Sequence, residues 1–229
     1  MKKKIAVLTG AGISAESGIK TFRDSNGLWE EHRVEDVASP EGWARNPELV
    51  LNFYNQRRRQ LLQCQPNRAH FALAELESKY EVTIITQNVD DLHERAGSTD
   101  IVHLHGELLK MRGVADESVV YECEEDINLG DLCVKGSQLR PHIVWFGEAV
   151  PKIEEAAYIV GHADIVIIIG TSLLVYPAAG LIHYSKYETP KWLVDPAEMQ
   201  LPHIPNLKFI NEKATIGVDY LVKELMADA

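Results

Sequence analysis

The sequence has little cysteine and no long apolar run. Only three of its 229 residues are cysteine, an odd number without the spacing of a disulfide framework, which favours a reducing compartment and a cytoplasmic protein. The most apolar segment, Ile165 to Ile169, falls far short of the roughly 20 residues that a membrane helix needs. The apolar run after the basic start, Ile5 to Leu8, is likewise too short for the core of a signal peptide. We therefore expect no membrane partner.

Basic residues are also in the minority. The 23 Lys and Arg residues face 34 Asp and Glu residues, and the formal charge of -11 repels phosphate backbones, so we expect no nucleic-acid partner. The content of 45% hydrophobic and 25% charged residues is typical of a globular protein. A chain of this length buries roughly 70% of its unfolded surface, so its core requires no disulfide or metal.

Short apolar runs alternate with helical patterns along most of the chain. The runs at 5–8, 82–85, 165–169 and 192–194 lack polar alternation, which is typical of parallel strands buried on both faces. Helical spacing of apolar residues covers 67–79, 151–160 and 214–226. This alternation predicts an α/β fold with a doubly wound, Rossmann-like parallel sheet. Ligands of such sheets bind beyond the carboxyl ends of the strands.

Two stretches, 20–64 and 107–140, interrupt the alternation. We expect them to form a small subdomain inserted into a larger one, which is made of residues 1–19, 65–106 and 141–229. The whole chain, 1–229, would then be a single catalytic domain.

A glycine-rich turn follows the first strand. Gly10-Ala11-Gly12 matches the loose form of the dinucleotide fingerprint, in which glycines allow close backbone approach and amides at a helix start hold phosphate. A plain tight turn is the alternative. An ordinary dehydrogenase would place a second strand and an acidic residue roughly 20 residues later. Residues 21–29 are instead polar and rich in turn formers, which disfavours a hydride-transfer enzyme.

Several separated motifs occur in a fixed order: Gly10-Ala11-Gly12-Ile13-Ser14 with Phe22-Arg23, Thr86-Gln87-Asn88-Val89-Asp90, His105-Gly106, Phe146-Gly147-Glu148 and Gly170-Thr171-Ser172. In this order they resemble the signatures of the sirtuins, which are NAD-dependent protein lysine deacylases. The resemblance runs from about Lys4 to the C-terminal helix. It implies that NAD is consumed as a co-substrate, that acylated lysine in an extended protein or peptide is the partner, and that nicotinamide and O-acyl-ADP-ribose are released. A mono-ADP-ribosyltransferase on the same fold and a non-catalytic nucleotide-binding module remain alternatives.

Three residues are candidates for the chemistry. Asn88 and Asp90 follow the strand that ends at Thr86, and His105 follows the strand 101–104. Cleavage of the nicotinamide–ribose bond requires groups that orient the amide and the sugar, and a base that works near neutral pH. The resemblance assigns the first role to Asn88 and Asp90 and the second to His105, and it leaves His103 as a structural histidine.

The resemblance also implies which residues hold the cofactor. Near the adenosine ribose the family usually carries asparagine or serine, but this chain has Leu193 and Val194 there. We therefore assign that role to the next residue, Asp195. The predicted cofactor-binding residues are Gly10, Ala11, Gly12, Ser14, Glu16, Thr21, Phe22, Arg23, Trp29, Gln87, Gly170, Thr171, Ser172, Asp195 and Ala214.

The acyl group is expected to meet a helix predicted over 47–62. Tyr54 and Arg57 lie three residues apart on one face of it, where a hydroxyl and a guanidinium together suit a carboxylate. Sirtuins that remove succinyl, malonyl or glutaryl groups resemble this arrangement, with a small alanine that Ala38 matches. The alternative is that residues 57–59 are a solvated basic run. By the same resemblance, Val144, Phe146, Gly147 and Glu148 contact a substrate peptide that adds itself as a strand.

The chain departs from the family pattern in its cysteines. Most sirtuins carry two Cys-x-x-Cys pairs that form a four-thiolate zinc site. Between His105 and Phe146 this chain has only Cys123 and Cys133. We therefore predict no structural zinc and a small subdomain held by packing alone.

Overall fold

The apolar runs form one parallel sheet in a computed structural model, which describes residues 2–19, 28–29, 32–171, 175–197 and 203–227. The strand order is β11-β10-β9-β1-β4-β5, which is the doubly wound order with β1 next to the point where the winding reverses. The predicted fold class is therefore confirmed. The strands are β1 Lys4–Thr9, β4 Glu81–Thr86, β5 Ile101–His103, β9 Ile165–Ile169, β10 Lys191–Val194 and β11 Leu207–Ile210.

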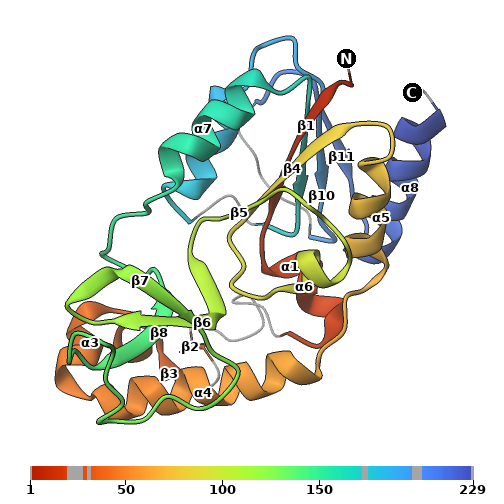
Figure 1. The fold of residues 1–229 in the computed structure, drawn as a ribbon. Helices are drawn as coiled ribbons and strands as arrows, with labels where there is room; N and C mark the ends of the chain where they lie inside the picture. The colour runs from red at the N-terminus through yellow and green to blue at the C-terminus, as the bar shows by residue number, and fades with distance from the viewer. Residues whose placement is uncertain (1, 20–27, 30–31, 172–174, 198–202, 228–229) are drawn as a thin grey trace.

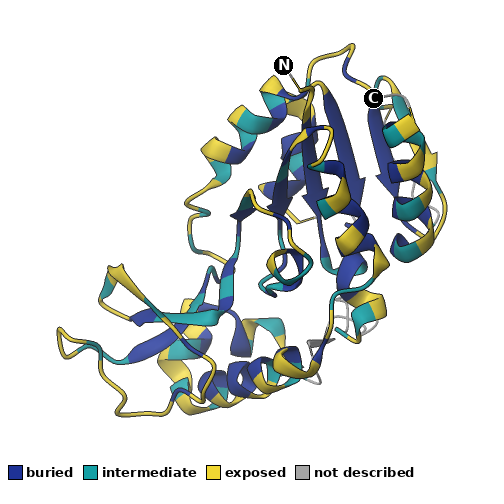
Figure 2. Cartoon of the chain, turned by 45° about the vertical axis from the view of Figure 1, so that its right-hand side comes forward, coloured by how far each residue is buried: buried dark blue, intermediate teal, exposed yellow. Residues whose placement is uncertain are grey.

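Helices cover both faces of this sheet (Figure 1). Val7 and Ile167 pack on one side against α5 and α8, and Leu8 and Ile168 pack on the other side against α7 and η3. Burial on both faces explains why the strands are uninterrupted apolar runs (Figure 2). These elements are α5 Arg68–Leu76, α8 Ala214–Ala227, α7 Ile153–His162 and η3 Ala178–Tyr184; the short α1 Ala11–Ser14, η1 Ala15–Ser17 and α6 Leu92–Arg95 follow strand ends. Within the described residues, none of the helices is both long enough and apolar enough to cross a membrane.

A second, smaller unit lies beside the sheet (Figure 1). It contains a three-stranded antiparallel sheet in the order β7-β6-β8, which the sequence did not predict because most of β7 is exposed and carries no apolar pattern. Strand β8 runs across the boundary expected at residue 140. The elements of the unit are β2 Leu28–Trp29, β3 His32–Arg33, α2 Val34–Val37, α3 Pro40–Arg45, α4 Pro47–Gln63, β6 Gly106–Gly113, β7 Asp116–Glu122 and β8 Leu139–Ile143.

A buried arginine ties this small unit together. The side chain of Arg58 on α4 is 0% exposed, and its Nε donates to the Leu108 carbonyl of β6 at 3.0 Å. Its Nη1 donates to Asn55 Oδ1 at 2.8 Å and to the Glu125 carbonyl at 3.2 Å. Asn55 in turn pairs with the backbone N–H and carbonyl of Ile127 at 3.0 and 2.9 Å. The prediction that packing alone holds the unit is therefore wrong, since polar bonds from α4 reach both β6 and the loop after β7.

The residues present do not fit the four-thiolate zinc site of most sirtuins. The chain has three cysteines in all, and Cys64 lies at the end of α4. Among the residues that the structure describes, neither Cys123 nor Cys133 belongs to a group of three or more possible metal ligands. The Cys123 thiol instead donates to the Glu125 carbonyl at 3.3 Å, in the same loop that Arg58 holds. That the protein works without zinc stays a prediction.

We expect Arg58→Met to lower the free energy of unfolding by roughly 2–4 kcal/mol, because it leaves buried carbonyl groups without a donor. The neighbouring Arg59→Met is the matched control, since Arg59 is 58% exposed and its ion pair with Asp126 contributes at most about 1 kcal/mol. Urea denaturation of the two variants measures the difference. A metal chelator should leave the wild-type midpoint unchanged. Equal losses in both variants, or a lowered midpoint with chelator, would contradict this account.

Candidate active site

Two backbone turns meet where the winding of the sheet reverses. The Gly10 amide donates to the Ile169 carbonyl at 3.0 Å, and the Gly12 amide donates to the Gly170 carbonyl at 2.9 Å. A Cβ on Gly12 would lie 2.5 Å from the Gly170 Cα, and Gly170 itself has a positive φ of 60°. Glycine is therefore required on both sides of this crossing. The amides of Gly10 and Gly12 take part in these two bonds, and the cofactor role expected of this turn stays a prediction.

A connected group of polar side chains lies directly behind this crossing. Asn88 Nδ2 donates to the Gly10 carbonyl and to Ser14 Oγ, each at 3.2 Å. The Ser14 hydroxyl donates to Asp90 Oδ2 at 3.0 Å, and the Leu92 amide at the start of α6 donates to Asp90 Oδ1 at 3.2 Å. The structure thus brings the predicted residues Ser14, Asn88 and Asp90 together at the carboxyl ends of β1 and β4.

Burial controls the charge of Asp90. Removal from water raises the pKa of its carboxyl to about 6, although hydrogen bonds from Leu92 and Ser14 oppose this rise. The group is consequently ionised at neutral pH and becomes protonated in mildly acidic solution. As a carboxylate it accepts both of these hydrogen bonds.

His105 follows β5 and is only partly exposed. Its Nδ1 lies 3.0 Å from the Gln87 carbonyl oxygen, which can only accept, so Nδ1 carries the hydrogen and Nε2 keeps its lone pair. Burial lowers the pKa of this imidazole, with a smaller opposing effect of the bond to Gln87. The ring is therefore neutral at pH 7 and suited to accept a proton. The Gln87 side chain also donates to Thr171 Oγ1 at 3.1 Å, which links the ends of β4 and β9.

Two predicted cofactor residues have their carboxylates in structural hydrogen bonds. Glu16 accepts from the backbone N–H and the hydroxyl of Thr215 at 3.0 and 2.9 Å, in the first turn of α8 beside Ala214. Asp195, buried at the end of β10, accepts from the Ala197 amide at 2.9 Å. The predicted residues Thr21, Phe22, Arg23 and Ser172, and the side chain of Trp29, lie outside the described residues.

The residues predicted to receive the acyl group belong to the small unit. Tyr54 is fully buried in the same apolar cluster as Ala38, and its hydroxyl accepts a hydrogen bond from Trp145 Nε1 at 3.1 Å. Burial raises the pKa of the Tyr54 phenol, which keeps it protonated, and the positive charge of half-buried Arg57 acts on it in the opposite direction. Tyr54 and Arg57 are therefore close enough to interact, as the helical spacing predicted.

The segment after β8 connects the two units. The Val144 amide donates to the His105 carbonyl at 2.9 Å, and the Phe146 amide donates to the Ala38 carbonyl at 3.0 Å. Phe146 is 50% exposed and Gly147 is also exposed, so both lie at the tip of the turn. The carboxylate of Glu148 faces inward, where it accepts from the Trp145 amide at 2.8 Å and from both terminal nitrogens of Arg140 at 2.8 and 3.2 Å. Glu148 holds the turn in shape.

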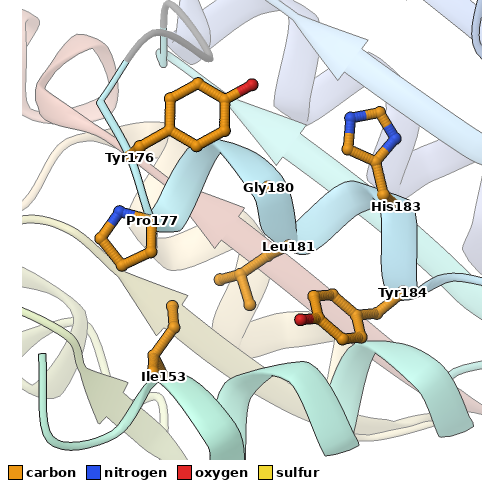
Figure 3. A pocket seen from close by; sticks show the side chains of 7 residues that line it. All are labelled: Ile153, Tyr176, Pro177, Gly180, Leu181, His183 and Tyr184. Carbon is orange, nitrogen blue, oxygen red and sulfur yellow. The ribbon is translucent and has the colours of Figure 1, made fainter.

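A pocket of about 420 Å³ lies elsewhere, between α7 and η3 (Figure 3). Tyrosine, leucine and isoleucine side chains dominate its wall, and none of its residues is among the predicted site residues. It is lined by Ile153, Tyr176, Pro177, Gly180, Leu181, His183 and Tyr184. The predicted catalytic side chains therefore lie at the strand ends and not in this pocket.

The family model described as "Sir2 family" matches residues 10–177. The chain belongs to the Sir2 family. A curated relative from Helicobacter pylori (strain ATCC 700392 / 26695), named NAD-dependent protein deacylase, is 57% identical over 225 residues and covers 98% of both chains. A relative of the same name from Bacteroides thetaiotaomicron is 53% identical over 99% of both chains.

Solved Sir2 structures share the whole fold. The NAD complex of a Sir2 homologue is 41% identical, with a TM-score of 0.88 over 99% of this chain and 91% of that one. A Sir2 protein bound to an acetylated peptide is 31% identical, with a TM-score of 0.77 over 99% of this chain and 93% of that one. The resemblance inferred from the motifs is thereby confirmed.

Replacement of the neutral histidine tests the Sir2-type site. We expect His105→Ala to abolish NAD consumption in the presence of an acylated peptide, because it removes the base. NAD affinity, measured by calorimetry, should change less than about threefold, because the group of Ser14, Asn88 and Asp90 is left intact. Full NAD consumption by this variant would contradict the role given to His105.

Proposed function

We propose that this Sir2-family protein is an NAD-dependent protein-lysine deacylase that removes succinyl- or malonyl-type acidic acyl groups as well as acetyl groups. The curated relatives from Helicobacter pylori and Bacteroides thetaiotaomicron, both named NAD-dependent protein deacylase, support the activity. The observation that carries the acidic acyl preference is that the charge of Arg57 acts on buried Tyr54, which shares an apolar cluster with Ala38.

The residues present fit an NAD site. Polar side chains from the ends of β1, β4 and β9 converge at the edge where doubly wound sheets bind dinucleotides, and the solved NAD complex of a Sir2 homologue has the same fold. We assign NAD to Ser14, Gln87, Asn88, Asp90 and Thr171. When bound, NAD supplies an activated ribose carbon and the ribose hydroxyl that accepts the acyl group.

The neutral His105 carries the proton transfer. Its Nε2 accepts the proton of the ribose hydroxyl, while Gln87 fixes the opposite ring nitrogen as a donor. The imidazole then holds a proton that it can return to the departing product. Asp90 and Asn88, linked through Ser14, orient the polar groups of the sugar and amide. One water molecule is consumed on this route, and the products are the deacylated lysine, nicotinamide and an O-acyl-ADP-ribose.

The acyl preference follows from charge and room. A guanidinium binds a carboxylate through two parallel hydrogen bonds, which a neutral acetyl group cannot match. The Tyr54 phenol is kept protonated by burial and is therefore a hydrogen-bond donor at neutral pH. Ala38 has a single methyl group, which takes up less room than a larger side chain would at this position. Arg57 discriminates, and Tyr54 supports it.

The exposed turn at Phe146 and Gly147 is the proposed docking site for the substrate. We expect an extended peptide to bind there through backbone hydrogen bonds, which give affinity with little sequence preference. The Sir2 protein solved with an acetylated peptide supports a peptide substrate. The formal charge of -11 disfavours nucleic acid as a partner. Three unpaired cysteines favour a cytoplasmic site of action.

Two peptides of identical sequence test the proposal, one with succinyl-lysine and one with acetyl-lysine. Each is incubated with the protein, with and without NAD, and the rate of acyl loss is measured. We expect NAD-dependent loss from both, faster from the succinyl peptide. Reaction of the acetyl peptide alone would refute the acidic preference, and reaction of neither would refute the deacylase itself.

Arg57→Met should lower kcat/KM for the succinyl peptide by roughly 10- to 100-fold, the effect of a lost charged hydrogen bond worth about 1.5–3 kcal/mol. For the acetyl peptide the change should stay below about threefold. Arg59→Met is again the matched control, because it removes an arginine of the same helix whose partner is Asp126. Equal losses on both peptides would mean that Arg57 supports structure and not acyl choice.

A further inference from the structure

A second histidine lies two residues before His105 and is not used in the mechanism above. His103, the last residue of β5, is 7% exposed. Its Nε2 lies 2.6 Å from a carboxylate oxygen of Glu94 on α6, and its Nδ1 lies 3.4 Å from the Asn88 carbonyl oxygen. Asn88 and Gln87 thus each have their carbonyl held by one of the two histidines.

Both partners of His103 can only accept a hydrogen bond. A neutral imidazole donates from one nitrogen and would turn a lone pair toward the other oxygen, whereas an imidazolium donates to both. Burial lowers the pKa of His103, but the bond to Glu94 and the charges of Glu94 and Glu107 outweigh it, so that the pKa is raised overall. The geometry and the surrounding charge therefore favour a positively charged ring at neutral pH.

This positive charge acts on the buried Asp90. The hydrogen bonds to Asp90 come from a hydroxyl and an amide, neither of which is charged. His103 attracts the carboxylate and thereby lowers the pKa of Asp90, against the rise that burial causes. The other charged or titratable groups around the two residues are Glu94, Glu107 with its partner Lys110, Asp91 with its partner Arg95, Cys64 and the buried His93.

We propose that His103, held by Glu94, is a positioning residue for the deacylation, whose imidazolium fixes the Asn88 backbone and keeps Asp90 ionised at neutral pH. This role rests on the proposed function, because it acts through Asp90 and Asn88. It divides the work between the two histidines: His105 stays neutral and takes the proton, and His103 stays charged and supports the carboxylate.

NMR titration tests the charges without any need for turnover. In the wild-type protein, the ring nitrogens of His103 should both carry hydrogen at pH 7, and the Asp90 carboxyl should titrate near pH 6. In His103→Gln, which keeps a donor but loses the charge, the Asp90 midpoint should move up by at least half a pH unit. A neutral His103 ring at pH 7, or an unmoved Asp90 midpoint, would overturn the inference.

The pH profile of kcat on the acetyl peptide gives the catalytic readout. The acid limb of His103→Gln should shift upward in parallel with Asp90, so that a shift of half a pH unit costs the variant about 1.5-fold at pH 6.5, a larger shift costs more, and almost nothing is lost at pH 8.5. Glu94→Gln, whose site is more exposed, should shift the limb in the same direction, and the double variant should be no worse than His103→Gln. A loss that is equal at every pH would mean a merely structural role and would overturn the inference.

His162→Gln is the control, because the hydrogen bond and the ring stacking that the structure shows for this exposed histidine both involve Tyr158 of its own helix. Its profile should match that of the wild type. If the wild-type protein is inactive but Asp90 titrates as predicted, only the proposed function is refuted. If the wild-type protein is active but the Asp90 midpoint does not move in His103→Gln, only the positioning role is refuted.

Discussion

The close crossing of Gly12 and Gly170 is the constraint on which the site depends. The backbones approach so closely that no side chain fits between them. Hydrogen bonds from the Gly10 and Gly12 amides join the ends of β1 and β9 at this point. The crossing places Ser14 against Asp90 and lets the Asn88 amide reach the Gly10 carbonyl. Two glycines that take no part in the reaction thereby help to position Ser14, Asn88 and Asp90.

The small unit completes the site and controls its electrostatics. The Leu108 amide of β6 donates to the Val89 carbonyl at 2.8 Å, and Leu92 packs into the apolar core of the small unit. The loop that carries Asn88 and Asp90 is therefore covered from both units, which explains why burial shifts the pKa values of the residues around it. The same burial gives opposite results at the two histidines, because only His103 has a carboxylate partner.

The sequence predicted what depends on local pattern and motif order. The central strands were found because burial on both faces demands continuous apolar runs, whereas the partly buried edge strand β11 was missed. The ordered motifs led to Asn88, Asp90 and His105. Helical spacing predicted that Arg57 lies close to Tyr54, but the longer-range partners of the basic run 57–59 were not predictable: Arg58 is buried between α4 and β6, and Arg59 pairs with Asp126 at the surface. The pairing of His103 with Glu94 was missed for the same reason, although the spacing of two residues from His105 was a signal.

The masses of the products formed from the succinyl-lysine peptide and NAD test the central claim most directly. The account predicts a peptide that has lost its acyl group, together with free nicotinamide and an ADP-ribose that carries the succinyl group. A peptide or protein that gains ADP-ribose while the lysine keeps its succinyl group would contradict the account and identify a transferase on the same fold.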